Sequence, residues 1–218
     1  MKRMKGAIFD MDGLLVDTER IFQAVWREMA ACRGVTLDGS FAVAISGTTG
    51  RDSEAVIRRF LPMVEDPAAF LEEGRQRVRE REREQVPLRP GAAEIVAGMR
   101  ERGLRLAVAS SSEMEMIRHN MDLTGLSPLF DVLISGTEYP LGKPAPDIFL
   151  GAASRLGLSP AECFVFEDSL NGVRAGLAAG CATVMIPDLV QPPEELASRC
   201  RGVYSSLSEA WKALSQTL

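Results

Sequence analysis

Short apolar runs alternate with amphipathic segments over most of the chain. The strands are predicted at residues 7–11, 104–110, 131–135, 163–168 and 182–187, and the helices between them near 91–102, 113–123, 145–156 and 170–179. A glycine follows three of these helices, which is typical of helix ends: Gly103, Gly157 and Gly180. Ser112 and Glu115 match the capping box that begins a helix. This alternation predicts an α/β fold with a doubly wound parallel sheet.

The stretch from about residue 17 to residue 86 breaks the alternation. Its segments have helical patterns and no convincing strand, among them TERIFQAVWREMAACRG, RDSEAVIRRFLP and DPAAFLEEGRQRVREREREQV. We therefore predict an α/β core, residues 1–15 and 87–218, with an all-helical domain, residues 16–86, inserted after the first strand. The run RQRVREREREQ mixes both signs of charge, which is typical of a solvated helix face rather than a nucleic-acid patch.

Composition argues against several classes of protein. Of the 218 residues, 46% are hydrophobic and 25% charged, and the net charge of −5 disfavours a nucleic-acid or anionic-membrane binder. The cysteines show no metal-binding spacing, and two of them, Cys163 and Cys181, adjoin apolar runs as buried small hydrophobes would. The start MKRMKGAIFDMDG lacks a signal-peptide stretch, and no run approaches transmembrane length. We expect a cytoplasmic protein, monomeric or weakly self-associating, with no nucleic-acid or membrane partner.

Polar side chains stand where the predicted strands end, and in parallel α/β sheets ligands bind beyond these ends. The side chains concerned are Asp10 and Asp12 after the first strand, Ser110, Ser111 and Ser112 after the second, Lys143 in GKPAPD after the third, and Glu167 with Asp168 at the end of the fourth. Taken singly, each has an ordinary explanation as a solvated acid, a helix cap or a surface lysine. Their order on successive strand ends predicts one reaction centre.

Four clustered carboxylates predict a bound cation. Such groups repel one another, and some would stay protonated unless a positive charge joined them. Oxygen ligands with room for water suit Mg²⁺. With Mg²⁺ and the Lys143 ammonium in place, an anionic phosphate could approach. We therefore expect Mg²⁺ as the cofactor and a ligand with a phosphate group; a small phosphate ester is what the family resemblance described next implies.

Four features of the chain resemble, in order, the four motifs of the haloacid dehalogenase-like phosphohydrolases. They are FDMDGLLVDTE, Ser110, Lys143 in GKPAPD, and VFEDSLNGV. The resemblance spans the whole chain, and the helical insertion is similar to the cap of the β-phosphoglucomutase-like, sugar-phosphatase subgroup. It implies a Rossmann-like core and a Mg²⁺-dependent phosphatase that forms an aspartyl-phosphate. The same stretches resemble pseudouridine-5′-phosphatases and 2-deoxyglucose-6-phosphatases. The implied substrates are therefore sugar phosphates or nucleoside and pseudouridine monophosphates.

The resemblance also implies a role for each reacting residue. Asp10 would take the phosphoryl group, and Asp12 would act first as general acid and then as general base. Ser110 and Lys143 would hold the phosphoryl oxygens.

Two further groups of residues are expected to bind rather than react. The resemblance implies a Mg²⁺ site formed by Asp10, the backbone carbonyl of Asp12, Asp168 and, directly or through water, Glu167. The candidate substrate contacts are Thr18, Arg51, Ser111 and Asn171. Arg51 belongs to the polar loop ISGTTGRD at 45–52, which is expected to select the substrate, although an ordinary helix start at Asp52 is nearly as good an explanation.

Other reactions of this family depend on residues that can be checked in the chain. A dehalogenase lacks the second aspartate, which is present here as Asp12. A phosphonatase uses a cap lysine, and the chain has none between Lys5 and Lys143. β-Phosphoglucomutases carry a histidine and a lysine where our alignment puts Phe22 and Ser46, so a phosphatase is favoured and a mutase is the alternative. A receiver-like phospho-aspartate regulator is the alternative from another class.

Overall fold

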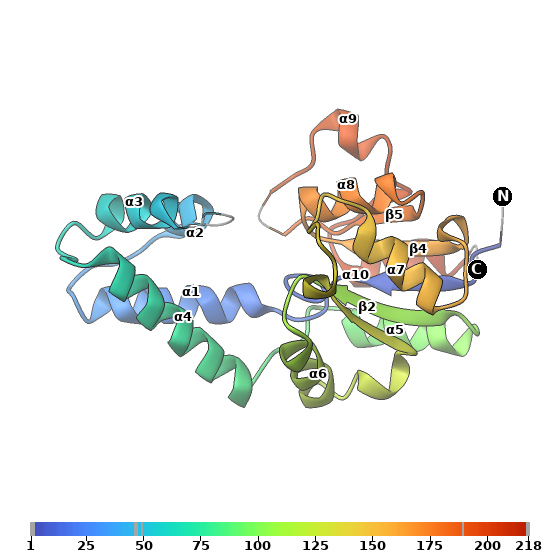
Figure 1. Ribbon diagram of the computed structural model, residues 1–218, viewed down its shortest axis with the longest axis horizontal. Coiled ribbons are helices and arrows are strands. Elements are labelled where there is room, and N and C mark those ends of the chain that lie inside the picture. The colour runs from blue at the N-terminus through green and yellow to red at the C-terminus, as the bar shows by residue number, and fades with distance from the viewer. Residues whose placement is uncertain (1–2, 46–47, 49, 189, 217–218) are drawn as a thin grey trace. The chain divides into compact units, whose positions relative to one another are not determined.

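The computed structural model describes residues 3–45, 48, 50–188 and 190–216. It divides into two compact units (Figure 1), which we call the core unit, residues 1–17 with 87–218, and the helical unit, residues 18–86. The assignment of a cap domain to residues 16–86 and of a catalytic core to residues 1–15 and 87–218 stays a prediction. Among the described residues, no helix is both long and apolar enough to cross a membrane.

Six parallel strands in the described part of the core unit form one sheet, in the order β3-β2-β1-β4-β5-β6. They are β1 (Gly6–Phe9), β2 (Arg105–Ser110), β3 (Val132–Ser135), β4 (Cys163–Glu167), β5 (Ala182–Met185) and β6 (Gly202–Val203). The predicted parallel α/β fold is confirmed, and β1 to β5 overlap the predicted runs. β6 was not predicted, because two residues are too few to show an alternation of apolar and polar positions.

The direction of the chain across the sheet reverses after β3, and this puts helices on both faces. Since parallel crossovers are right-handed, the core-unit helices that follow β1 and β2 lie on one face and those that follow β3 and β4 on the other. The helices are α5 (Ala92–Glu101), α6 (Met114–Leu123), α7 (Asp147–Arg155), α8 (Leu170–Ala178), α9 (Glu194–Ala197) and α10 (Leu207–Leu214), with 3₁₀ turns at Ser127–Leu129, Gly136–Glu138 and Pro160–Glu162. The sheet is therefore doubly wound.

Alternate residues of the two central strands face opposite sides of the sheet. Ile8 and Val165 belong to the hydrophobic cluster that contains Phe149 of α7. Phe9 and its register partner Phe166 point the other way, with their rings stacked 4.7 Å apart. Burial on both faces fixes β1 and β4, and with them the residue that follows each strand.

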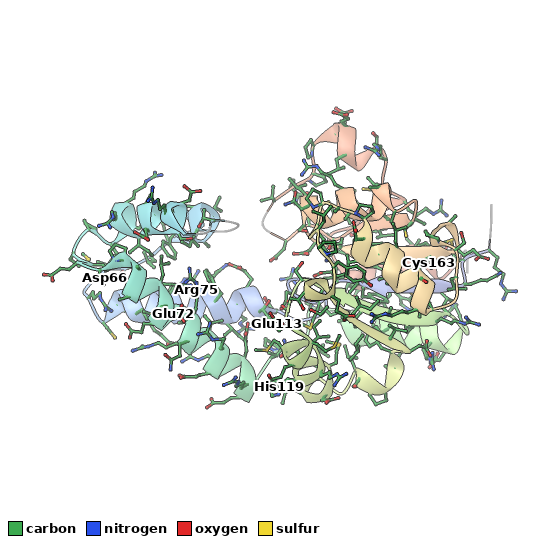
Figure 2. All side chains as sticks on the ribbon, in the orientation of Figure 1. Asp66, Glu72, Arg75, Glu113, His119 and Cys163 are labelled. Carbon is green, nitrogen blue, oxygen red and sulfur yellow. The ribbon has the colours of Figure 1, made fainter. Side chains whose placement is uncertain are left out.

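Two cysteines contribute to this core as small apolar side chains. Cys163 (Figure 2) begins β4 and Cys181 precedes β5, and both are buried in the same cluster. Burial raises the pKa of the Cys163 thiol to about 11 and that of Cys181 to about 12. Neither is a thiolate at neutral pH, and their predicted role as buried hydrophobes is confirmed.

The described residues of the helical unit form four helices: α1 (Thr18–Ala31), α2 (Gly39–Ile45), α3 (Arg51–Phe60) and α4 (Pro67–Glu84). Three of them overlap predicted segments, whereas α2 has only seven residues and too little pattern for prediction. The core of this unit is aromatic. The indole ring of Trp26 lies 5.4 to 6.0 Å from the rings of Phe22, Phe41 and Phe70.

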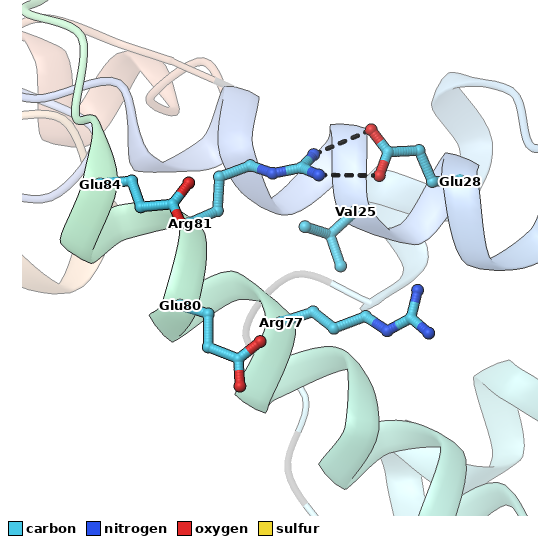
Figure 3. A pocket seen from close by; sticks show the side chains of 6 residues that line it. All are labelled: Val25, Glu28, Arg77, Glu80, Arg81 and Glu84. Atoms are coloured by element: carbon cyan, nitrogen blue, oxygen red, sulfur yellow. Dashed lines mark hydrogen bonds and ion pairs between the residues drawn. The ribbon is translucent and has the colours of Figure 1, made fainter.

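The second half of α4 carries the run of mixed charges. Arg81 donates to both carboxylate oxygens of Glu28 on α1, at 2.8 and 3.0 Å, beside a pocket of about 290 Å³ (Figure 3). Arg77, which also lines the pocket, pairs with Glu73 at 2.7 Å. These charged side chains are 40–54% exposed, and ion pairs this accessible to solvent stabilise a fold little. This part of α4 is a solvated surface, as its charge pattern predicts.

Gly74 of α4 has no room for a side chain. A Cβ here would collide with the indole ring of Trp26, which is 1% exposed. Alanine normally favours a helix over glycine by about 1 kcal/mol. We nevertheless expect Gly74→Ala to lower the free energy of unfolding in urea by about 1–3 kcal/mol, because the core becomes overpacked. Gly39→Ala, where a Cβ meets open space, is the control and should be neutral or stabilising. A Gly74→Ala variant as stable as the wild type would contradict this packing.

Candidate active site

Lys143 is the centre of a buried group of charges at the ends of β1, β2 and β4. Its ammonium, 8% exposed, donates to the Asp10 carboxylate, to Glu167 Oε1 at 2.6 Å and to the carbonyl of Ala109 at 3.2 Å. These three acceptors match the three protons of an ammonium. Burial acts to lower the pKa of Lys143, but the attraction of Asp10 and Glu167 outweighs it and raises the pKa above its ordinary value. Lys143 is therefore charged at neutral pH.

Glu167, the last residue of β4, is held by the helix that follows it. Its Oε2 accepts hydrogen bonds from the N–H of Asp168 at 3.1 Å and from the N–H and hydroxyl of Ser169 at 3.1 and 3.0 Å. Ser169 also caps α8 by accepting from the N–H of Gly172 at 3.0 Å. A Cβ on Gly172 would overlap the Glu167 carboxylate. Lys143 thus binds one oxygen of Glu167, and the two residues that lead into α8 bind the other, near a helix N-terminus that favours negative charge.

Asp10 directly follows β1 and is 6% exposed. Its N–H donates to the carbonyl of Phe166 at 3.0 Å, one residue beyond the end of β1. Asp10, Glu167 and Asp168 each present an oxygen atom within 4.8 Å of the others. Burial raises the pKa of Asp10, against the attraction of Lys143, and burial with repulsion from Asp10 and Glu167 raises the pKa of Asp168. Three carboxylates around one ammonium favour a further cation.

The carboxylate of Asp12 is bound at the end of β2. Its Oδ2 accepts hydrogen bonds from the hydroxyl of Ser110 at 3.0 Å and from that of Ser112 at 2.8 Å. Gly13, with a φ of 83°, lets the chain turn here, and its N–H donates to the carbonyl of Val16 at 2.9 Å. The two acids of the first motif therefore have different neighbours.

Ser112 and Ser135 belong to this site. The sequence puts Ser112 at a strand end but predicts it as a helix cap, and it does not predict Ser135. The capping box predicted for Ser112 and Glu115 is wrong, because Glu113 is the N-cap of α6 and makes no side-chain capping bond. The N–H of Ser112 instead donates to Ser110 Oγ at 3.0 Å, and its carbonyl accepts from the hydroxyl of Ser135 at 2.6 Å. The three consecutive serines at a predicted strand end are the available signal. Ser135 can be recognised as a neighbour of these serines only once β3 is known to pair with β2.

The four predicted substrate contacts are distributed over both units. In the core unit, Ser111 is exposed after β2, and Asn171 is exposed on α8, where its side chain accepts a hydrogen bond from Arg174 at 3.2 Å. In the helical unit, Thr18 begins α1 and Arg51 begins α3. Within the loop 45–52, residues 46, 47 and 49 lie outside the described residues. The part of all four residues in binding stays a prediction.

Known proteins are similar to this chain in sequence and in fold. A family model for haloacid dehalogenase-like hydrolases matches residues 4–180. Hexitol phosphatase B of Escherichia coli (strain K12) is 33% identical over 190 residues, which cover 85% of each chain. A probable pseudouridine-5′-phosphatase of Drosophila melanogaster is 32% identical over 217 residues, 96% of this chain and 92% of that protein. A solved structure from Thermotoga maritima, assigned as a β-phosphoglucomutase, covers 99% of this chain and 100% of its own, with a TM-score of 0.82 and 25% identity.

Removing the Lys143 ammonium should destabilise the fold. Lys143→Met leaves Asp10 and Glu167 buried without their counter-charge, so we expect the free energy of unfolding in urea at pH 7, with EDTA, to fall by about 3 kcal/mol. The raised pKa of Asp10 would rise further in this variant. Because the two proteins share the same unfolded state, the deficit should grow as the pH rises through about 8, where the Asp10 carboxyl group ionises in the folded wild type but stays protonated in the folded variant.

Lys212→Met is the matched control, since Lys212 is exposed on α10. A Lys143→Met variant within about 1 kcal/mol of this control, the range of exposed ion pairs, would contradict a buried ion cluster.

Proposed function

The chain belongs to the haloacid dehalogenase-like hydrolases, and we propose that it is a Mg²⁺-dependent phosphatase of a small phosphate monoester that forms an aspartyl-phosphate at Asp10. The observation that carries this proposal is the buried contact between the Asp10 carboxylate and the Lys143 ammonium at the end of β1. The carboxylate can attack phosphorus while the ammonium attracts the phosphoryl oxygens.

The donor set fits Mg²⁺. Asp10 and Asp168 offer oxygen atoms close enough for one ion, and because burial raises the pKa of both groups, a divalent cation would favour their ionised form. These two side chains and the backbone carbonyl of Asp12 would hold the ion. Glu167 would take part through water, since Lys143 and α8 already bind its oxygens. When bound, Mg²⁺ would supply positive charge to the transferring phosphoryl group.

Two proton transfers at Asp12 complete the reaction. Asp10 forms a bond to phosphorus while the bond from phosphorus to the ester oxygen breaks, and Asp12 gives its proton to that oxygen. The ionised Asp12 then takes a proton from water, which attacks phosphorus, releases inorganic phosphate and restores Asp10. Ser110 and Lys143 hold the phosphoryl oxygens, where positioning and electrostatics supply most of the catalysis.

Sugar-alcohol phosphates, sugar phosphates and nucleoside monophosphates are the favoured substrates. The similarity to a hexitol phosphatase and to a pseudouridine-5′-phosphatase over most of the chain supports this class. Thr18, Ser111, Arg51 and Asn171 would contact the part of the substrate beyond the phosphate. A panel with Mg²⁺ distinguishes the members of the class: sorbitol 6-phosphate, fructose 1-phosphate, uridine 5′-monophosphate and pseudouridine 5′-monophosphate.

A phosphosugar mutase is the second candidate, because a protein assigned as a β-phosphoglucomutase has the same fold. A mutase must keep the phosphoryl group until a second sugar hydroxyl arrives. Phe22, at the position of the mutase histidine, is an aromatic residue packed against Trp26 and has no proton to exchange. Ser46, at the position of the mutase lysine, lies outside the described residues. A receiver-like regulator would lack steady turnover, and the inserted helical unit and Asp12 argue against it.

Asp10→Asn should abolish turnover, because an amide does not attack phosphorus. We expect kcat/KM on the best panel substrate to fall by at least about a thousandfold, as for other lost nucleophiles. Asp122→Asn, at an exposed position of α6, is the matched control, and circular dichroism checks the fold. EDTA should inactivate the wild type, and added Mg²⁺ should restore it. Near wild-type turnover by re-purified Asp10→Asn would show that the role of Asp10 is wrong.

Free phosphate should be the main product even under conditions that favour a mutase. The test supplies β-glucose 1-phosphate with a trace of the 1,6-bisphosphate and follows both products over time. Phe22 offers no acid–base help for transfer to a sugar hydroxyl, so water should accept the phosphoryl group. Glucose 6-phosphate forming much faster than free phosphate would decide for the mutase.

A further inference from the structure

Two serine hydroxyls donate hydrogen bonds to one oxygen of the Asp12 carboxyl group. The hydroxyls of Ser110 and Ser112 both donate to Oδ2, at 3.0 and 2.8 Å. The backbone of Ser112 is itself fixed, because its N–H donates to Ser110 Oγ at 3.0 Å and its carbonyl accepts from Ser135 Oγ at 2.6 Å. Ser110 and Ser135 are buried at the ends of β2 and β3, which pair with each other. The sheet, rather than α6, therefore holds Ser112 in place.

Substrate binding changes the hydrogen-bond acceptor of Ser110 but not that of Ser112. A hydroxyl has one proton to donate. In the proposed mechanism the Ser110 hydroxyl donates its hydrogen bond to a phosphoryl oxygen, so it no longer donates to Asp12. Ser112 has no such second acceptor in the mechanism and can stay with Asp12 throughout.

We propose that Ser112 is a positioning residue that orients the Asp12 carboxyl group for proton transfer to the leaving oxygen. A hydrogen bond to Oδ2 leaves Oδ1 to carry the proton and fixes the plane of the carboxyl group. Orientation of this kind contributes to the rate because the acid must lie within hydrogen-bond reach of the oxygen that it protonates. The inference rests on the proposed function, since it requires Asp12 to be the general acid.

The leaving group of the substrate separates this role from a purely structural one. The value of kcat/KM reports on the steps up to formation of the aspartyl-phosphate. In these steps a sugar-alcohol oxygen needs a proton, whereas 4-nitrophenolate leaves without one. Ser112→Ala should lower kcat/KM at least about tenfold for sorbitol 6-phosphate, but less than about twofold for 4-nitrophenyl phosphate. Ser112→Thr keeps the hydroxyl and should recover most of the lost activity.

Ser154→Ala, at an exposed position of α7, is the matched control and should leave both values unchanged. Asp12→Asn is the reference for a lost acid. It should show the same preference for 4-nitrophenyl phosphate, and adding Ser112→Ala to it should not change the ratio of the two kcat/KM values further.

The outcomes distinguish failure of the inference from failure of the proposed function. If Asp12→Asn depends on the leaving group but Ser112→Ala loses equally on both substrates, or loses nothing, the inference alone is overturned. Failure of Ser112→Thr to recover activity with sorbitol 6-phosphate would count against the hydroxyl in the same way. If Asp12→Asn loses equally on both substrates, Asp12 is not the acid, and the inference is overturned together with the proton-transfer step of the proposed function.

Discussion

The ammonium of Lys143 lies between two carboxylates that adjacent strands carry to one edge of the sheet. Asp10 follows β1 and Glu167 ends β4, so the pairing of these strands brings two buried acids together. Desolvated carboxylates this close are costly unless a counter-charge and hydrogen bonds satisfy them. Lys143 meets that requirement with all three of its protons. The ion cluster is therefore a constraint on the structure around it rather than a source of extra stability.

The residues that lead into α8 also bind Glu167, so the packing of this helix is part of the same constraint. The second oxygen of Glu167 needs hydrogen-bond donors, and the N–H groups of Asp168 and Ser169 supply them. The helix can approach so closely because Gly172 has no side chain to strike the carboxylate. Gly172 therefore allows the start of α8 to lie against Glu167, which in turn binds Lys143. The position of Lys143 relative to Asp10 depends on helix packing as well as on the sheet.

Residues at strand ends were predictable from the sequence because their placement depends on little more than the order of the strands. Apolar runs identify the strands, and Asp10, Lys143 and Glu167 then follow from the rule that sites lie at carboxyl ends. The part played by Ser112 was not predictable, since a loop conformation decides whether its hydroxyl caps α6 or binds a carboxylate. That of Gly172 depends on a helix-to-sheet distance, which no local pattern encodes. The helix α2 was missed because seven residues show too little periodicity.

The two acids of the first motif differ in the charge of their partners, and this difference matches the two roles proposed for them. Asp10 contacts an ammonium, whose attraction opposes the effect of burial and favours the carboxylate that a nucleophile must be. Asp12 contacts two neutral hydroxyls, which can remain bound whether or not the carboxyl group carries a proton. A group that first gives a proton and then takes one needs partners of this second kind. Pairs of acids in contrasting environments are how one site supplies both a nucleophile and a proton donor, and here the contrast arises because Lys143 contacts Asp10 whereas the serines that follow β2 contact Asp12.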